Sequence, residues 1–151
     1  MKKQSNLYQY EESLEDKGYS FVAGVDEVGR GPLAGPEVVA AVILPMGHRI
    51  KGINDSKKLT EKKREELYKI IMKEALAVSV VYIYEDESDK INIYEATKKG
   101  MLEAVRRLSI KPDHVLIDAM PLHRHSARRW HSTAPRPHCR NHGTPIFSIL
   151  R

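Results

Sequence analysis

Two short apolar runs on either side of a glycine- and proline-rich segment constrain the fold of this chain more than any other feature. The first run covers residues 21–26, the second covers residues 38–44, and Gly-Arg-Gly-Pro-Leu-Ala-Gly-Pro fills positions 29–36 between them. Apolar, β-prone runs of this length that are bounded by turn residues predict strands, and their closeness predicts a hairpin-like pair. We therefore expect the chain to build a sheet from its N-terminal part.

Helical and strand patterns follow one another in the rest of the first 120 residues. Helices are expected at 6–16, at 61–75 with Thr60 as N-cap, and at 91–108; strands are expected at 77–84 and 114–117. The last helix should bury its apolar positions, which are Ile93, Ala96, Met101, Ala104, Val105 and Leu108. Adjacent strands followed by alternating helices and strands predict an α/β fold, and 151 residues suit one compact domain.

The segment 121–151 differs sharply in composition from the residues before it. The formal net charge is +5, yet residues 1–120 carry 19 basic and all 20 acidic residues, whereas 121–151 carries six Arg, no Lys and no acid. The same segment holds five of the seven His and four of the eight Pro. We expect this tail to be disordered and not to continue the core, so the net charge says little about the domain itself.

Membrane and secreted classes are not expected from the sequence. No apolar run reaches the roughly 18 residues that a membrane span requires, and the polar N-terminal residues do not resemble a signal peptide. The single cysteine, Cys139, excludes an internal disulfide and a CxxC metal site. These features predict a cytoplasmic protein without a membrane partner.

Acidic residues end two of the expected strands. Asp26 ends the first apolar run and Glu27 follows it, and Asp118 follows the last one. If the two strand ends lie together, the three carboxylates form a cluster that suits Mg²⁺ or Mn²⁺. Neighbouring side chains on a regular strand point to opposite faces, so Asp26 and Glu27 converge only if the strand twists or bulges there. The alternative is that these acids cap turns or pair with lysines.

Basic residues near these acids suggest contacts with phosphate. Arg30 lies between Gly29 and Gly31, where the backbone can approach a ligand closely and the guanidinium group can bind phosphate. The dinucleotide-binding pattern is not met, because the third glycine is not at its place. Lys57 and Lys58 precede the helix expected from residue 61 and could face a phosphate backbone, although a solvated helix start is the better interpretation of these residues taken alone.

Three segments taken together resemble a known family. DEVGRGPLAGP at 26–36, DSKKL at 55–59 and VLID at 115–118 are similar, in order and separation, to the signatures of bacterial ribonuclease HII, and the resemblance covers roughly residues 19–122. It implies a ribonuclease H-like mixed sheet flanked by helices. The implied activity is endonucleolytic cleavage of RNA in RNA/DNA hybrids and at ribonucleotides embedded in duplex DNA, in DNA replication and repair, with 5′-phosphate products.

The related ribonuclease HIII group shares much of the first motif but carries an extra N-terminal domain. Only about 20 residues precede position 21 here, which favours ribonuclease HII. We expect a monomer.

The resemblance also assigns roles to particular residues. It implies that Asp26, Glu27 and Asp118 are the first three metal-binding and catalytic acids of a two-metal site that uses Mn²⁺ or Mg²⁺. Substrate binding is implied for five further residues: Gly29, Arg30 and Gly31 at the ribonucleotide 2′-hydroxyl, and Lys57 and Lys58 at the phosphate backbone. The expected partner is therefore an RNA/DNA hybrid or a ribonucleotide-containing DNA duplex.

The chain departs from the family pattern after Asp118. The family's next signature, a Gly-Asp-Ala-rich segment before an alanine-rich helix, is absent, and no Asp or Glu follows Asp118 to serve as a fourth metal-binding acid. We therefore expect three parts: an N-terminal helical extension at 1–18, a C-terminally incomplete catalytic domain at 19–122, and an unrelated tail at 123–151. The hypothesis is that the tail is out-of-frame translation after a frameshift near codons 120 to 123, which resequencing would test.

Two alternatives to an active enzyme with an accidental tail remain open at this stage. The tail contains zinc-ligand residue types, namely His123, His125, His138, Cys139 and His142, but their spacing matches no zinc-binding pattern. The whole chain could also be a catalytically inactive remnant that binds nucleic acid through Arg30, Lys57, Lys58 and the basic tail.

Overall fold

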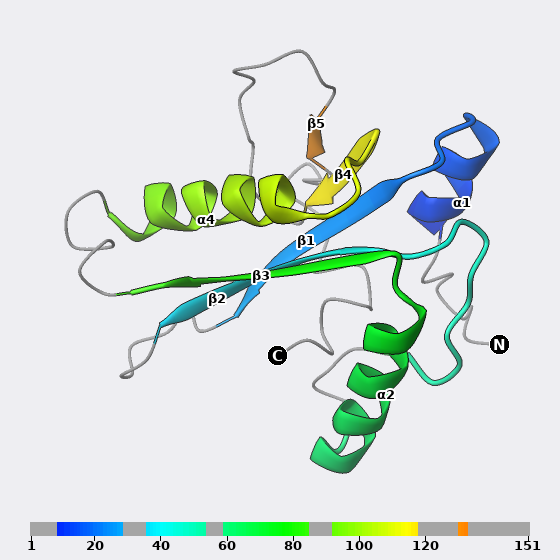
Figure 1. Ribbon diagram of the computed structural model, residues 1–151, viewed down its shortest axis with the longest axis horizontal. Helices are drawn as coiled ribbons and strands as arrows, with labels where there is room; N and C mark the ends of the chain where they lie inside the picture. Colours follow the sequence, from blue (N-terminus) through cyan, green and yellow to red (C-terminus); the bar gives the residue numbers. More distant parts are fainter. Residues whose placement is uncertain (1–8, 29–35, 54–58, 85–91, 118–129, 133–151) are drawn as a thin grey trace, which may run out of the picture.

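A computed structural model describes residues 9–28, 36–53, 59–84, 92–117 and 130–132 of the protein. Within these residues a five-stranded mixed sheet has the strand order β3-β2-β1-β4-β5 (Figure 1). The elements are α1 (Gln9–Asp16), β1 (Val22–Val28), β2 (Glu37–Ile43), α2 (Glu61–Glu74), β3 (Ala77–Ile83), α4 (Ile93–Arg107), β4 (His114–Ile117) and β5 (Trp130–Ser132). The predicted α/β fold with a mixed sheet is thereby confirmed.

Strand β1 lies at the centre of the sheet. It pairs with β2 in antiparallel register from Ala23↔Ile43 to Val28↔Val38, which confirms the predicted hairpin-like pair. On its other side β1 pairs with β4 in parallel, and Val25↔Ile117 is the last pair of that ladder. Because β1 and β4 are parallel, their C-terminal ends lie at the same edge of the sheet.

One face of the sheet packs against α4, which crosses β1, β2 and β3. The resulting cluster of buried side chains includes Val25, Val39, Ile43, Val81, Met101 and Ile117. Gly100 allows the close approach, because a Cβ at this position would overlap Ile83 Cδ1 and would lie 3.2 Å from Val39 Cγ2. The helical spacing predicted the buried face of α4 correctly except at Ile93, which is 46% exposed.

The opposite face of the sheet carries α1 and α2, and α2 lies below the sheet in Figure 1. Thr60 caps α2 as predicted, with its side-chain oxygen accepting from the N–H of Lys63. Leu67 and Ile71 of α2 are fully buried against Val42 of β2. A second, smaller cluster joins α1 to the sheet through Leu14, Val22 and Leu116.

A short strand lies within the segment that we expected to be disordered. Residues 130–132 form β5, which pairs in parallel with β4 from Val115↔Trp130 to Ile117↔Ser132. Without this pairing β4 would present a row of unpaired backbone groups at the edge of the sheet. The expectation of no regular structure in the tail is therefore wrong at these three residues, and the other residues of 123–151 lie outside the described part of the chain.

No helix in the described part of the chain is both long enough and apolar enough to cross a membrane.

Candidate functional site

Asp26 and Glu27 lie close to the C-terminal end of the central strand. Asp26 is opposite Ala40 and Glu27 is opposite Val39 in the ladder with β2, and both acids are half-buried. The pair Val25↔Ile117 brings the end of β4 beside this part of β1. Two of the three predicted acids thus lie at the edge where the two parallel strands end. The third, Asp118, follows Ile117 in the sequence and lies outside the described residues.

The two neighbouring acids point to opposite faces of the sheet. The sequence predicts that Asp26 and Glu27 converge only if the strand twists or bulges. The β1–β2 register is unbroken from Ala23 to Val28, so β1 has no bulge against β2 within these residues. Val25 belongs to the cluster beneath α4, and strand alternation places Glu27 on that face and Asp26 on the face of α1. The ladder keeps this alternation because every residue of β1 from Ala23 to Val28 has a partner in β2.

The carboxylate groups at the end of β1 are of the chemical type that binds divalent metal ions. Asp26 Oδ1 accepts a hydrogen bond of 2.9 Å from the backbone N–H of Glu27. Carboxylate oxygens at a half-buried strand end are ligands of the type that Mg²⁺ and Mn²⁺ prefer, so the donor set fits such an ion. Among the described residues, however, no three His, Cys, Asp or Glu side chains lie close enough to hold a metal.

The predicted substrate-binding residues lie outside the part of the chain that the structure describes. Gly29, Arg30 and Gly31 follow Val28 at the end of β1, and Lys57 and Lys58 precede Leu59, two residues before α2 begins. Their proposed contacts with a 2′-hydroxyl and with phosphates stay predictions.

A buried acid near the site was missed by the sequence reasoning. Glu37, the first residue of β2, is only 4% exposed, and its two carboxyl oxygens each lie 2.8 Å from Thr97 Oγ1 of α4. Thr97 Oγ1 lies 2.7 Å from the carbonyl oxygen of Ile93 as well. The sequence held one signal, because Glu37 is the single charged residue that begins an otherwise apolar strand.

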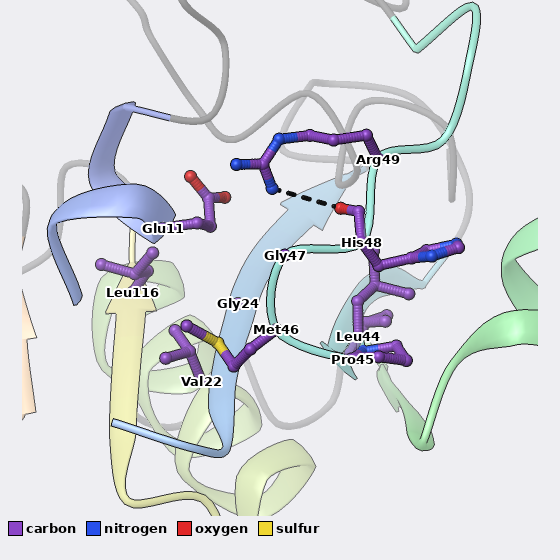
Figure 2. Close-up of a pocket in the computed structure, with 11 residues that line it drawn as sticks. Glu11, Val22, Gly24, Leu44, Pro45, Met46, Gly47, His48, Arg49 and Leu116 are labelled. Atoms are coloured by element: carbon purple, nitrogen blue, oxygen red, sulfur yellow. Dashed lines mark hydrogen bonds between the residues drawn. The ribbon is translucent and has the colours of Figure 1, made fainter. Parts of the chain in front are cut away.

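A pocket opens on the face of the sheet that carries α1. Its walls come from α1, β1, β2, β4 and the segment after β2, through Glu11, Val22, Gly24, Val42, Leu44, Pro45, Met46, Gly47, His48, Arg49 and Leu116. In Figure 2 the Glu11 carboxyl group and the Arg49 guanidinium group point toward one another. Gly24 is two residues before Asp26 on the same face, so the pocket and Asp26 lie on the same face of the sheet.

Glu11 is the titratable group that this pocket perturbs. Burial raises the pKa of Glu11 above its ordinary value of 4.5, while a hydrogen bond from the backbone and the charge of Arg49 act in the opposite direction. Glu11 Oε2 is buried without a hydrogen-bond partner in the described part of the structure. Arg49 Nη2 lies 3.0 Å from Oε1 of Glu12.

Comparison with known families and proteins extends the match over most of the chain. The family model of ribonuclease HII matches residues 23–139, which runs past the predicted domain boundary at 122. Ribonuclease HII of Listeria monocytogenes serovar 1/2a is 58% identical over 120 residues, which are 80% of this chain and 46% of that protein. The chain thus spans about half the length of the curated relatives it matches.

Solved structures show the same fold. The ribonuclease H2 of Pyrococcus horikoshii OT3 superposes with a TM-score of 0.71 at 24% identity, covering 86% of this chain and 69% of that one. Bst-RNase HIII in complex with Mn²⁺ gives a TM-score of 0.63 at 20% identity, covering 87% of this chain and 50% of that one. The family match over residues 23–139 includes β1 and β4, whose ends carry the acids, and on this ground the chain belongs to the ribonuclease HII family.

Proposed function

We propose that this chain is a divalent-metal-dependent endonuclease that hydrolyses the RNA strand of RNA/DNA hybrids and cleaves at ribonucleotides embedded in duplex DNA, leaving 5′-phosphate products. The observation that carries the proposal is the position of Asp26 and Glu27 at the end of β1, beside the end of β4, inside the segment that matches ribonuclease HII. Strand ends that meet at one sheet edge are where a fold of this kind can gather carboxylates around an ion.

The metal-binding part of the proposal uses the register of the two parallel strands. Val25 pairs with Ile117, so continuing the ladder by one residue would bring Asp118 opposite Asp26 on the same face. We assign Asp26, Glu27 and Asp118 as ligands of Mn²⁺ or Mg²⁺, a choice supported by the Mn²⁺ complex of Bst-RNase HIII. When bound, two such ions would activate the attacking water and stabilise the leaving 3′ oxygen.

The substrate-binding part of the proposal uses the segments next to this strand end. The backbone at Gly29 and Gly31, together with Arg30, would contact the ribonucleotide, where a 2′-hydroxyl distinguishes RNA from DNA. Lys57 and Lys58 would contact phosphates and add affinity that does not depend on sequence. The enzyme would act as a monomer in the cytoplasm.

A second candidate function is binding of the same nucleic acids without cleavage. It is favoured by the absence of Asp and Glu from residues 119–151, because a two-metal site that lacks one of its carboxylates would lose most of its turnover. In that case Arg30, Lys57 and Lys58 would still hold a duplex.

One experiment separates the two candidates. The chain is incubated with a DNA duplex that contains a single ribonucleotide, in the presence of Mn²⁺, Mg²⁺ or a chelator, and duplex binding is followed in parallel by fluorescence anisotropy. Cleavage next to the ribonucleotide that requires metal and is lost in Asp26→Asn supports the endonuclease. Binding without any metal-dependent product at high protein concentration rejects the endonuclease for this chain and supports the binding function.

A further inference from the structure

The contact between Glu37 and Thr97 joins β2 to α4 at one end of the sheet. Thr97 is fully buried and Glu37 is 4% exposed, so neither side chain can replace this contact with water. Each Glu37 carboxyl oxygen lies 2.8 Å from Thr97 Oγ1, within hydrogen-bond distance. A buried carboxyl group is costly unless it is hydrogen-bonded, so this contact holds the two elements together where it occurs.

The contact lies next to the proposed metal site. Glu27 pairs with Val39 in the β1–β2 ladder, and Glu37 lies two residues from Val39 on the same, α4-facing side of β2. Side chains at such diagonal positions of neighbouring strands lie close enough for long side chains to interact. Glu37 also follows Pro36, the residue at which the described chain resumes after Val28. The contact therefore sits beside Glu27 and at the end of the connection that carries Arg30.

The Thr97 hydroxyl group has one hydrogen and two neighbouring acceptors, and this bears on which side chains at position 37 can keep the contact. A hydroxyl group has one hydrogen, yet Thr97 Oγ1 lies 2.8 Å from the Glu37 carboxyl group and 2.7 Å from the Ile93 carbonyl oxygen. Thr97 Oγ1 is the donor in both contacts, so its one hydrogen serves either the Glu37 carboxylate or the Ile93 carbonyl oxygen at a time. A glutamine side chain keeps an oxygen that can accept from Thr97 and adds an amide that can donate to it, so Gln should preserve the contact, whereas Val should abolish it.

We propose that Glu37 is a positioning residue for the catalytic strand end: through Thr97 it fixes the first turn of α4 against β2, and it thereby holds Glu27 in place for metal binding. The role of Glu27 as a metal ligand is taken from the proposed function. In this role Glu37 acts through Thr97 and is not itself assigned as a metal ligand. Substitution by Val leaves the Thr97 hydroxyl bonded to Ile93 and fills the space with apolar atoms, so the fold is expected to survive.

The test compares Mn²⁺ binding by four variants of the full chain, measured from the electron paramagnetic resonance signal of free Mn²⁺. Glu37→Gln should bind Mn²⁺ with nearly unchanged affinity. Glu37→Val and Thr97→Val should each weaken binding by about tenfold, the lower end of the effect of groups that orient metal ligands. Ser79→Ala is the matched control, because Ser79 is another buried polar residue on the α4-facing side of the sheet and should leave binding unchanged.

Two results would overturn the proposal. Unchanged Mn²⁺ affinity in Glu37→Val, measured while Asp26→Asn loses binding, would show that the contact does not position the site. If the unsubstituted chain binds no Mn²⁺, the proposed function fails, and amide hydrogen exchange then decides the positioning role. In that experiment Glu37→Val should accelerate exchange at Glu27 and Val28, whereas Glu37→Gln and Ser79→Ala should not. Equal exchange in all variants would exclude it.

Discussion

The face of the sheet beneath α4 is filled by one continuous cluster of side chains, whereas the opposite face is covered by two separate clusters with a pocket between them. The two neighbouring acids of β1 are divided between these faces, since Glu27 lies on the α4 side and Asp26 lies on the side of α1 and the pocket. This difference in packing indicates that the two faces have different roles. The α4 face fixes the position of the strands, and the face that carries Asp26 is the one that also holds a pocket.

The largest expected effect tests whether the proposed metal site uses carboxylates from both faces of the sheet. Asp26→Asn and Glu27→Gln should each lower metal-dependent cleavage by about a hundredfold or more, because removing a direct ligand should cost more than removing a group that orients one. The measurement is the initial rate of cleavage of a duplex with one ribonucleotide. Glu65→Gln, an exposed position on α2, is the control. A loss in Asp26→Asn alone would confine the metal site to the α1 face.

Two neighbouring residues of β4, one on each face of the sheet, test the difference in packing between the faces. Ile117 belongs to the cluster beneath α4, and its neighbour Leu116 belongs to the small cluster that lines the pocket. Ile117→Ala should lower the free energy of unfolding by about 4 kcal/mol and Leu116→Ala by about 2.5 kcal/mol, because a space that opens into the existing pocket adds less enclosed cavity. Urea unfolding measures both. Equal losses would mean that the two faces are packed equally well.

Local sequence signals predicted the elements on both faces well. The strand at 114–117 was predicted with its observed bounds, and the helix after Thr60 ends one residue before its predicted end. These elements follow from the apolar period and from a capping side chain, which depend only on residues nearby in the sequence. Ile93 was predicted to be buried and is exposed, because as the first residue of α4 its side chain lies at the helix end.

Features that depend on distant pairing could not be predicted in the same way. The absence of a bulge at Asp26 is fixed by the ladder with β2, and the burial of Glu37 depends on Thr97, which is 60 positions away in the sequence. Strand β5 is stabilised by its pairing with β4, and its own composition carries no strand period. For the candidate site, sequence named the acids but could not assign them to faces of the sheet.

Gly100 offers a smaller test of the α4 face. Gly100→Ala should lower the free energy of unfolding by about 1–2 kcal/mol, since the added methyl group overlaps Ile83 and this overpacking outweighs the higher helix propensity of Ala. The measurement is chemical unfolding of both proteins at pH 7. Gly100→Ala combined with Ile83→Val is the matched rescue, because the shorter side chain removes Cδ1. If the single variant is more stable than the parent chain, α4 does not approach the sheet as closely as described.

The smallest expected effect belongs to Glu11 on the pocket face, and it depends on pH. A carboxyl group whose pKa is raised in the folded state favours that state below its unfolded value of 4.5, and this contribution is lost as the pH rises through the folded pKa. At pH 7, above the unfolded value, the folded state therefore carries the cost of keeping this carboxyl group in a partly desolvated place. Glu11→Gln removes this cost, so its Tm should exceed that of the parent chain slightly at pH 7.

The pH dependence distinguishes desolvation of Glu11 from loss of an attraction to Arg49. If desolvation dominates, the difference in Tm between Glu11→Gln and the parent chain should shrink toward zero as the pH falls below 4.5, where the parent carboxyl group is protonated in both the folded and the unfolded state. If attraction to Arg49 dominated instead, Glu11→Gln would be less stable than the parent at pH 7. Glu12→Gln is the control, because Glu12 is paired with Arg49 and half-buried, and its substitution should lower Tm slightly at pH 7. If Glu11→Gln raises Tm at pH 7 and Glu12→Gln lowers it, the unfavourable charge belongs to Glu11 in the pocket.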